Sequence, residues 1–367
     1  MRTYTHEEVY RIALQSAHSL TWRQQEMLLN TYGTAEAVLT RMDQGVREIA
    51  GDKAYDELRN IRKMGARQLL DQLEAAGAQA VFREDADYPA LLREIADPPH
   101  MLFLRGTPAT DEKSVAIVGS RRDTRYGRTQ AKKIARDLAS AGVTVVSGLA
   151  RGIDTAAHEG ALEAGGRTVA VLGNGIDAVY PEENKGLAQR IIDSGGAVVT
   201  EFPVGAGPLA YHFPIRNRII SGVSAAVLLI EGHAHSGTMI TAGYAAEQGR
   251  EVFALPGAVD APGSAAPLAL LRDGAGICTC AGDILVDMGW MPREPRVEEI
   301  EFSQARLAGL SDVQRKIAEL MLEEPRSFEE LVNESGIPPE TLSAELTLME
   351  LDGVTEARAG RIYALKA

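Results

Sequence analysis

The chain has 367 residues and a formal net charge of −13, and 45% of its residues are hydrophobic. This length accommodates one large α/β core with smaller domains beside it, and the composition is typical of a globular protein. The sequence shows no basic-then-apolar leader and no run of about 18 apolar residues, which excludes a membrane span and favours a soluble, cytoplasmic protein.

The negative charge is unevenly distributed along the chain. Residues 1–110 and 111–290 each carry a net charge of −3, whereas residues 291–367 carry −7. The middle block contains a basic cluster in which Asp123 is the one acid. The cluster comprises Lys113, Arg121, Arg122, Arg125, Arg128, Lys132, Lys133 and Arg136. Such a cluster favours a partner that carries phosphate groups, while the negative total limits unspecific binding.

Helical periodicity in residues 1–80 predicts a small N-terminal helical domain. The expected helices cover residues 7–17, 22–31, 35–42 and 52–76, with Gly33, Gly51 and Gly77 as breaks. The segment contains no catalytic constellation. It therefore predicts a compact module similar to sterile-alpha-motif or helix-hairpin-helix domains.

Residues 81–290 show the alternation of an α/β domain. A proline-punctuated connector over 88–106 ends in a short strand, 101–104. The expected strands that follow are 114–119, 143–147, 168–172, 197–201, 225–230 and 251–255, and the expected helices lie near 126–141, 154–164, 184–194, 216–221 and 238–248. Because these short apolar runs lack polar alternation, we expect a doubly wound, Rossmann-like parallel sheet that binds its ligand at the carboxyl ends of the strands.

The C-terminal part predicts a linker over residues 291–305 and a winged-helix domain over 306–367. Helices are expected at 312–323, 327–334 and 339–351, followed by a β-pair around Ala359-Gly360. No Lys or Arg occurs between Arg326 and Arg358, and this span has a net charge of −8. Because duplex DNA would repel such a domain, we expect it to contact protein rather than to act as a DNA-reading transcription regulator.

The apolar run from Ser114 to Val118 leads into Gly119, Ser120 and Arg121, directly before an expected helix. Backbone N–H groups, a helix dipole and a guanidinium would then converge on one point, which favours an anion. The next strand ends in Ser147 and Gly148 and would reach the same edge of the sheet. We therefore expect a phosphate-binding site formed by these strand ends.

Phe213, Arg216, Asn217 and Arg218 place two arginines and an amide near a proline-stiffened helix start. These donors suit phosphate and base edges. A structural salt bridge with Glu201 or Glu231 is the alternative, and both interpretations can hold together. The glycine-hydroxyl segment 236–238 before the next helix either binds an anion or caps that helix.

Other motifs favour simpler explanations. Gly173-Asn174-Gly175 is a degenerate dinucleotide motif, and His233 with His235 lacks a third metal ligand, so we expect no cofactor and no metal. Cys278 and Cys280 are interpreted as buried or idle thiols. Ser147, Asp154 and His158 are interpreted as a helix cap and a hydrogen-bonded histidine rather than as catalytic residues.

Between Tyr88 and about Ala275 the sequence resembles the DNA-processing protein A (DprA, or Smf) family. The motifs that carry the resemblance are Tyr88-Pro89 with Asp97-Pro98-Pro99, residues 117–121, residues 147–154 with Ala157-His158, Tyr180-Pro181 with Asn184, Phe213-Pro214 with Arg216-Asn217-Arg218, and Ser236-Gly237-Thr238 with Pro256-Gly257. The C-terminal part is similar to the winged-helix domain that many members carry.

The resemblance implies a non-enzymatic protein that binds and protects incoming single-stranded DNA and loads the RecA recombinase during natural transformation. It implies DNA contacts by the strand-end and Phe213–Arg218 residues, and a homodimer. The apolar run 267–271, expected at a sheet edge, provides the interface with Leu268, Leu271 and Ile277.

The sequence departs from the family pattern in places. Family members commonly have basic residues where this chain has Glu182 and Ala210, and Lys185 is placed to replace the first of them. Ala265-Ala266-Pro267 replaces a common Gly-Asn pair. The alternative function is a Rossmann-type nucleotide phosphoribohydrolase, but residues 233–238 lack the double glycine of that group.

Overall fold

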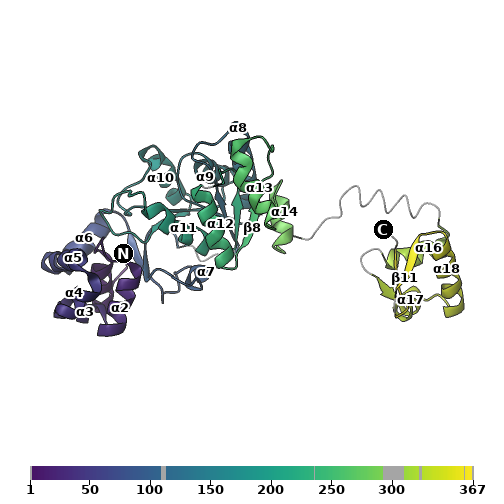
Figure 1. Cartoon of the computed structure of the whole chain (residues 1–367), viewed down its shortest axis with the longest axis horizontal. Coiled ribbons are helices and arrows are strands. Elements are labelled where there is room, and N and C mark those ends of the chain that lie inside the picture. The colour runs from purple at the N-terminus through teal and green to yellow at the C-terminus, as the bar shows by residue number, and fades with distance from the viewer. Residues whose placement is uncertain are drawn as a thin grey trace. The chain divides into compact units, whose positions relative to one another are not determined.

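The computed structural model describes residues 2–108, 113–234, 236–291, 310–321, 325–358 and 360–365. The chain divides into two compact units, Met1–Met291 and Pro292–Ala367 (Figure 1). The linker predicted over 291–305 lies outside the described residues except for Met291.

The larger unit begins with helices that cover the expected N-terminal domain. They are α1 His6–Gln15, α2 Trp22–Tyr32, α3 Ala35–Arg41, α4 Gln44–Ala50, α5 Asp52–Met64 and α6 Ala66–Ala75. The single helix expected over 52–76 is wrong, because the chain turns at Gly65 with a φ of 87°, a conformation that glycine adopts without strain. Helix α4, which the sequence analysis missed, begins at an Asp43 cap. Leu28, Val38 and Leu39 lie in the core of this helical layer.

A 9-stranded sheet in the order β1-β2-β6-β5-β4-β3-β7-β8-β9 forms the centre of this unit. The strands are β1 Gln79–Phe82, β2 Met101–Gly106, β3 Ser114–Val118, β4 Thr144–Ser147, β5 Thr168–Val171, β6 Ala197–Thr200, β7 Ala226–Leu229, β8 Glu251–Ala254 and β9 Gly276–Ile277. The fold is the expected Rossmann-like α/β architecture. However, β2 pairs antiparallel with both β1 and β6, so the sheet is not parallel at this edge.

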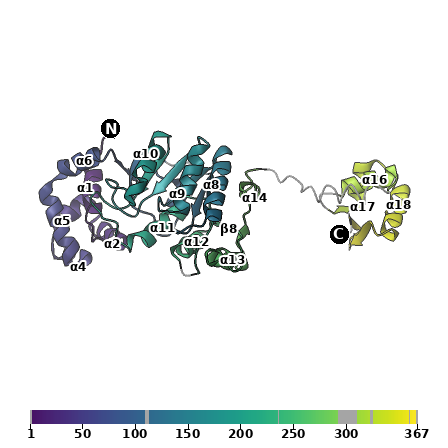
Figure 2. The ribbon, with the colours of Figure 1, turned by 90° about the horizontal axis from the view of Figure 1, so that it is seen from above.

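Helices cover both faces of the sheet. One face packs against α8 Arg125–Ser140, α9 Ile153–Glu163, α10 Lys185–Asp193 and α14 Ala281–Asp287. The other face packs against α7 Ala90–Arg93, α11 His212–Gly222 and α12 Gly237–Glu247. Figure 2 shows α8, α9 and α10 on the opposite side of the sheet from α11 and α12. The residues of β3 to β7 are buried on both faces, which explains the largely apolar sequences of these strands.

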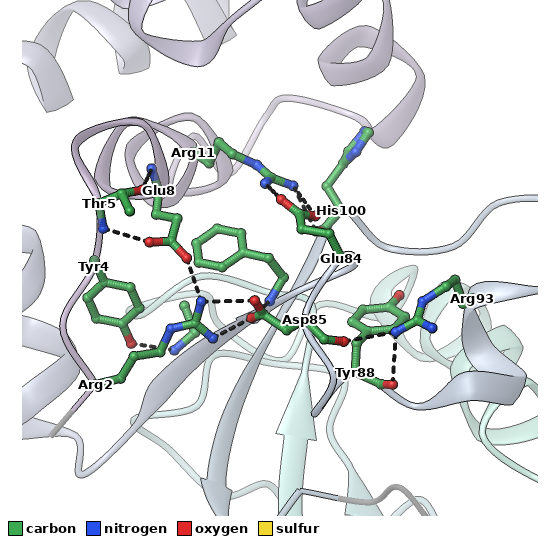
Figure 3. A network of polar contacts seen from close by, with 12 residues as sticks. Arg2, Tyr4, Thr5, Glu8, Arg11, Glu84, Asp85, Tyr88, Arg93 and His100 are labelled. Carbon is green, nitrogen blue, oxygen red and sulfur yellow. Dashed lines mark hydrogen bonds and ion pairs between the residues drawn. The ribbon is translucent and has the colours of Figure 1, made fainter.

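Polar contacts fasten the N-terminal helices to the edge of the sheet. The Arg2 guanidinium bridges the carboxylates of Glu8 and Asp85, and Arg11 binds Glu84 and donates to the carbonyl oxygen of His100 at 3.3 Å (Figure 3). Both arginines also lie over the ring of Phe82. The helical layer and the sheet therefore form one compact unit.

The run Pro267–Leu271, expected at a sheet edge, instead belongs to helix α13 Ala265–Arg272. The expectation was wrong because a short apolar run fits a half-buried helix as well as a strand. Ile277 does lie on the edge strand, β9, and is 61% exposed.

The smaller unit has the expected winged-helix elements. They are α16 Asp312–Leu320, β10 Arg326–Ser327, α17 Phe328–Ser335, α18 Pro339–Leu351, β11 Thr355–Arg358 and β12 Ile362–Leu365. The three strands form a sheet in the order β10-β12-β11. Residues 322–323 of the expected first helix and Ala359 of the expected β-pair lie outside the described residues.

Replacing His158 by asparagine is expected to reduce the loss of stability in mild acid. The buried His158 shares a 2.7 Å hydrogen bond between its Nδ1 and the Thr168 hydroxyl, and burial lowers its pKa to about 3. The unfolded chain therefore takes up a proton below about pH 6.5 that the folded chain excludes, so stability falls as the pH drops. Between about pH 7.5 and about pH 5, this proton uptake lowers the free energy of unfolding by about 2 kcal/mol.

Urea denaturation at the two pH values measures this difference. The amide of the introduced asparagine keeps a donor near Thr168, so the variant tests titration rather than lost packing. The exposed His6→Asn change is the matched control. If the free energy of unfolding of His158→Asn falls with pH as steeply as that of the parent protein, His158 is not the group responsible.

Candidate functional site

The loop after β3 carries Gly119, Ser120 and Arg121, but helix α8 does not follow directly. The chain continues to an N-cap at Thr124, and α8 begins at Arg125. The N–H of Thr124 donates to the Glu231 carboxylate at 2.9 Å, and its hydroxyl donates to the same group. A Cβ at Gly127 would lie 2.3 Å from Glu231. The expectation of a phosphate at this helix N-terminus was therefore wrong, because the protein's own carboxylate lies there.

A cleft of about 530 Å³, termed the strand-end cleft, opens beyond the carboxyl ends of β3 and β7. From β3 the chain proceeds to β4 on one side, whereas β7 and β8 extend the sheet on the other. The cleft thus lies where doubly wound sheets bind ligands. Its lining includes Gly119, Ser120, Arg121, Ala150, Asp154, Tyr180, Phe213, Pro214, Arg216, Asn217, His233, Ser236, Gly237 and Thr238.

Arg121 is the exposed cation of this cleft. Its guanidinium carbon lies 4.9 Å from the centre of the Phe213 ring, and the Tyr180 ring lies 5.7 Å from that of Phe213. Among the described residues, no acid forms an ion pair with Arg121. The cleft therefore combines a cation available to an anion with aromatic rings available to planar groups.

Arg216 lies beneath the cleft and is 3% exposed. It donates to the carbonyl oxygens of Gly148, at 2.7 Å, and of Val171. Burial lowers its pKa to about 10, against the opposing effect of the nearby Asp154 carboxylate, and burial raises the pKa of Asp154. Arg216 therefore remains charged at neutral pH and adds positive charge below Arg121.

Glycine is required beside this buried guanidinium. A Cβ at Gly148 would lie 2.5 Å from Arg216 Nη1. A Cβ at Gly119 would likewise lie 2.5 Å from the Ile153 side chain. The two strand-end glycines admit close neighbours, which is a packing role beneath the cleft.

Three expected site residues lie elsewhere. Ser147 is buried, and its hydroxyl donates to the carbonyl oxygen of Ile117 at 2.7 Å. Lys185 is exposed at the start of α10 and does not line the strand-end cleft. Arg218 lies on another side of α11, where it pairs with Glu201 and Asp97. The alternative of a structural salt bridge is confirmed for Arg218 and Glu201.

Some lining residues of the cleft were not among the expected site residues. Tyr180 was quoted only as part of a family motif. Ser236, Gly237 and Thr238 begin α12, whose N-cap Ser236 makes no side-chain cap bond. Asn217, an expected residue, donates to the Gly237 carbonyl oxygen at 3.2 Å. The segment 236–238 was expected either to bind an anion or to cap its helix, and it lines the cleft without a side-chain cap.

Within the described part of the chain, no group of three or more His, Cys, Asp or Glu side chains could hold a metal ion. His235, one of the two histidines considered as ligands, lies outside the described residues. Also among those residues, none of the helices has the length and apolar character needed to cross a membrane.

Comparison with known families decides the relationship of this chain. A family model described as DNA recombination-mediator protein A matches residues 79–289, and the DprA winged helix domain matches residues 303–361. The chain belongs to the DNA recombination-mediator protein A family.

Relatives within this family include Protein Smf of Synechocystis, 34% identical over 81% of this chain and 82% of that protein. A putative DNA processing protein DprA of Mycobacterium tuberculosis is 35% identical over 88% of this chain and 82% of its own length. Protein Smf of Escherichia coli is 43% identical, and the match spans 61% of each of the two chains.

Solved structures of DNA processing protein A have the same fold. The Streptococcus pneumoniae protein superposes with a TM-score of 0.64 at 33% identity, covering 78% of this chain and 98% of that one. A Helicobacter pylori structure that addresses the single-stranded DNA binding mode gives a TM-score of 0.51 at 28% identity, covering 57% of this chain and 95% of that one.

Proposed function

We propose that this chain is a single-stranded DNA-binding recombination mediator and that the strand-end cleft holds the strand. The observation that carries the proposal is the position of Arg121 over the Phe213 ring in a cleft at the switch point of the sheet. A guanidinium binds phosphate through paired hydrogen bonds, and aromatic faces stack on unpaired bases. The Helicobacter pylori relative, whose structure addresses single-stranded DNA binding, supports the same ligand.

Each residue has a distinct proposed role. Arg121 binds a phosphate at the cleft entrance, and the N-terminus of α12 with Ser120 provides further donors. Tyr180 and Phe213 contact bases, while the buried Arg216 contributes charge without leaving its carbonyl partners. Asn217 holds the α12 segment at the wall of the cleft.

The biological setting is part of the proposal. We place the chain in the cytoplasm, where it protects incoming DNA and loads RecA during natural transformation, as the family resemblance implies. We also propose binding rather than catalysis. The acid lining the cleft, Asp154, is buried and accepts a hydrogen bond from the Ala150 N–H at 3.3 Å, an arrangement that supports a structural role. Release of free base from nucleoside monophosphates would instead support the phosphoribohydrolase alternative.

Fluorescence anisotropy with labelled oligonucleotides at two salt concentrations tests the function. The full chain is expected to bind single-stranded oligonucleotides at least about tenfold more tightly than the matched duplex, because base stacking needs unpaired bases. Affinity should fall as salt rises, since phosphate binding releases counterions. Equal affinity for the duplex, or affinity independent of salt, would contradict the proposal.

Changing Leu268 and Ile277 together to glutamate is expected to convert a homodimer into monomers. Ile277 is 61% exposed on the edge strand β9, and Leu268 lies partly exposed on the adjacent α13 with Leu271. Charges buried in an apolar interface cost several kcal/mol. Sedimentation velocity measures the change, and Met27→Glu, at an exposed apolar residue of the N-terminal helix α2, is the control. A dimer that persists would place the interface elsewhere.

A further inference from the structure

A second and larger cleft, of about 750 Å³, lies between the N-terminal helices and the sheet on the other side of α11. We call it the interlayer cleft. The α11 residues His212, Ile215 and Arg218 line it, whereas Phe213, Arg216 and Asn217 line the strand-end cleft. Its volume lies within the range of about 300–1,000 Å³ typical of small-molecule sites.

Aromatic and imidazole rings line the interlayer cleft. Trp22 and His100 are stacked, with ring centres 6.1 Å apart and planes at 19°. Phe202 and His212 are stacked at 4.0 Å and 23°. Tyr211, next to His212, is 60% exposed. A planar heterocycle is the kind of ligand that such rings bind.

A buried ion pair lines the same cleft. Glu201 is 8% exposed and Arg218 is 4% exposed, and the guanidinium donates to the Glu201 carboxylate. Among the described residues, neither Glu201 Oε1 nor Arg218 Nη1 has a hydrogen-bond partner. Buried polar atoms without partners are costly, so a ligand edge that carries both donors and an acceptor would be stabilised here.

The rim of the cleft carries two cations, Arg23 and Lys53, beside two acids, Asp52 and Asp97. Helix α5 begins in it at Asp52, and its N-cap Gly51 provides no side-chain cap bond. Lys53 and Arg23 are exposed lining residues, and within the described structure neither forms an ion pair. The carboxylate of Asp52 pairs with Arg47 at 2.6 Å. The N–H groups of an uncapped helix start together with two cations suit a phosphate.

We propose that the interlayer cleft binds a purine nucleotide. The base lies against the aromatic rings with its edge toward Glu201 and Arg218, and the phosphate lies at the start of α5. Guanine fits best, because its edge offers two N–H donors to a carboxylate beside a carbonyl oxygen that accepts from a guanidinium. The bond from Arg11 to the carbonyl oxygen of His100, which lines the cleft, holds His100 against the N-terminal helices (Figure 3).

Isothermal titration of the full chain with guanosine monophosphate, adenosine monophosphate, uridine monophosphate and inorganic phosphate tests this site. We expect saturable binding with the guanine nucleotide tightest and uridine monophosphate or phosphate alone much weaker. Lys53→Glu should lower the affinity for guanosine monophosphate at least about tenfold, which is equivalent to losing one charged hydrogen bond. Tyr211→Ala should lower this affinity several-fold. Lys63→Glu, an exposed change near the other end of α5, should change it by less than about twofold.

Arg121→Ala separates the two clefts, because it should weaken single-stranded DNA binding and leave guanosine monophosphate binding intact. Nucleotide binding that depends on Arg121 and not on Lys53 or Tyr211 would overturn the proposal. Oligodeoxythymidine with and without a single guanine distinguishes the source of the ligand. If the guanine raises the affinity for the oligonucleotide and Lys53→Glu removes this increase, the occupant is a base of the bound strand. If the guanine does not raise that affinity but mononucleotides bind saturably, the occupant is a free nucleotide. Absence of both would refute the site.

Discussion

Replacing Arg121 by alanine is expected to weaken the binding of single-stranded DNA by about 10- to 150-fold. This range corresponds to about 1.5–3 kcal/mol for a hydrogen bond to a charged group. The Arg121 guanidinium is exposed, lies 4.9 Å from the Phe213 ring centre and has no acidic partner among the described residues. It therefore enters a complex without losing an existing ion pair, so most of its interaction with phosphate is gained on binding.

Anisotropy titrations at fixed salt measure the effect, with Arg136→Ala as the matched control. Arg136 is an exposed arginine of the same basic cluster, but it pairs with Asp137 at 3.1 Å and does not line the strand-end cleft. Its replacement should change affinity by less than about threefold. The midpoint of urea unfolding should be unchanged in both variants. An affinity of Arg121→Ala within twofold of the parent protein, or equal losses in both variants, would remove Arg121 from the site.

Replacing Arg218 by alanine is expected to destabilise the larger unit by about 3–5 kcal/mol, because it leaves the Glu201 carboxylate buried and unpaired. Arg218 is 4% exposed and connects α11 with two acids, Glu201 and, at 3.2 Å, Asp97. The loss is expected as a lower urea midpoint with the same dependence on denaturant.

A double variant provides the control for this prediction. Arg218→Met with Glu201→Leu removes both charges and should recover most of the stability, since apolar pairs often replace buried ion pairs at little cost. The prediction would be contradicted if Arg218→Ala kept the urea midpoint of the parent protein but bound single-stranded DNA as weakly as Arg121→Ala. Arg218 would then contact the strand rather than serve mainly as the partner of Glu201.

The sequence by itself determined most strands and helices of the α/β domain, and it determined the family. Unbroken apolar runs such as Val115–Val118 and Ala226–Leu229 were identified as strands because parallel strands are buried on both faces, and both lie in the sheet. The motif around Gly119 and Arg121 correctly indicated the edge of the sheet where the strand-end cleft opens. Local patterns of this kind predict the strands and helices and the position of the switch point in the sheet.

Only the tertiary structure decided which side chains meet in the cleft. Arg216 and Arg218 are two positions apart, and at about 100° per helical residue they face different sides of α11, so one lies beneath the strand-end cleft and the other lines the interlayer cleft. Glu231, more than a hundred residues further along the chain, comes to lie at the N-terminus of α8. Helical spacing alone predicts that the two arginines face different sides of α11. Which cleft each side lines, and where Glu231 lies, depend on the distant elements that pack against the helices.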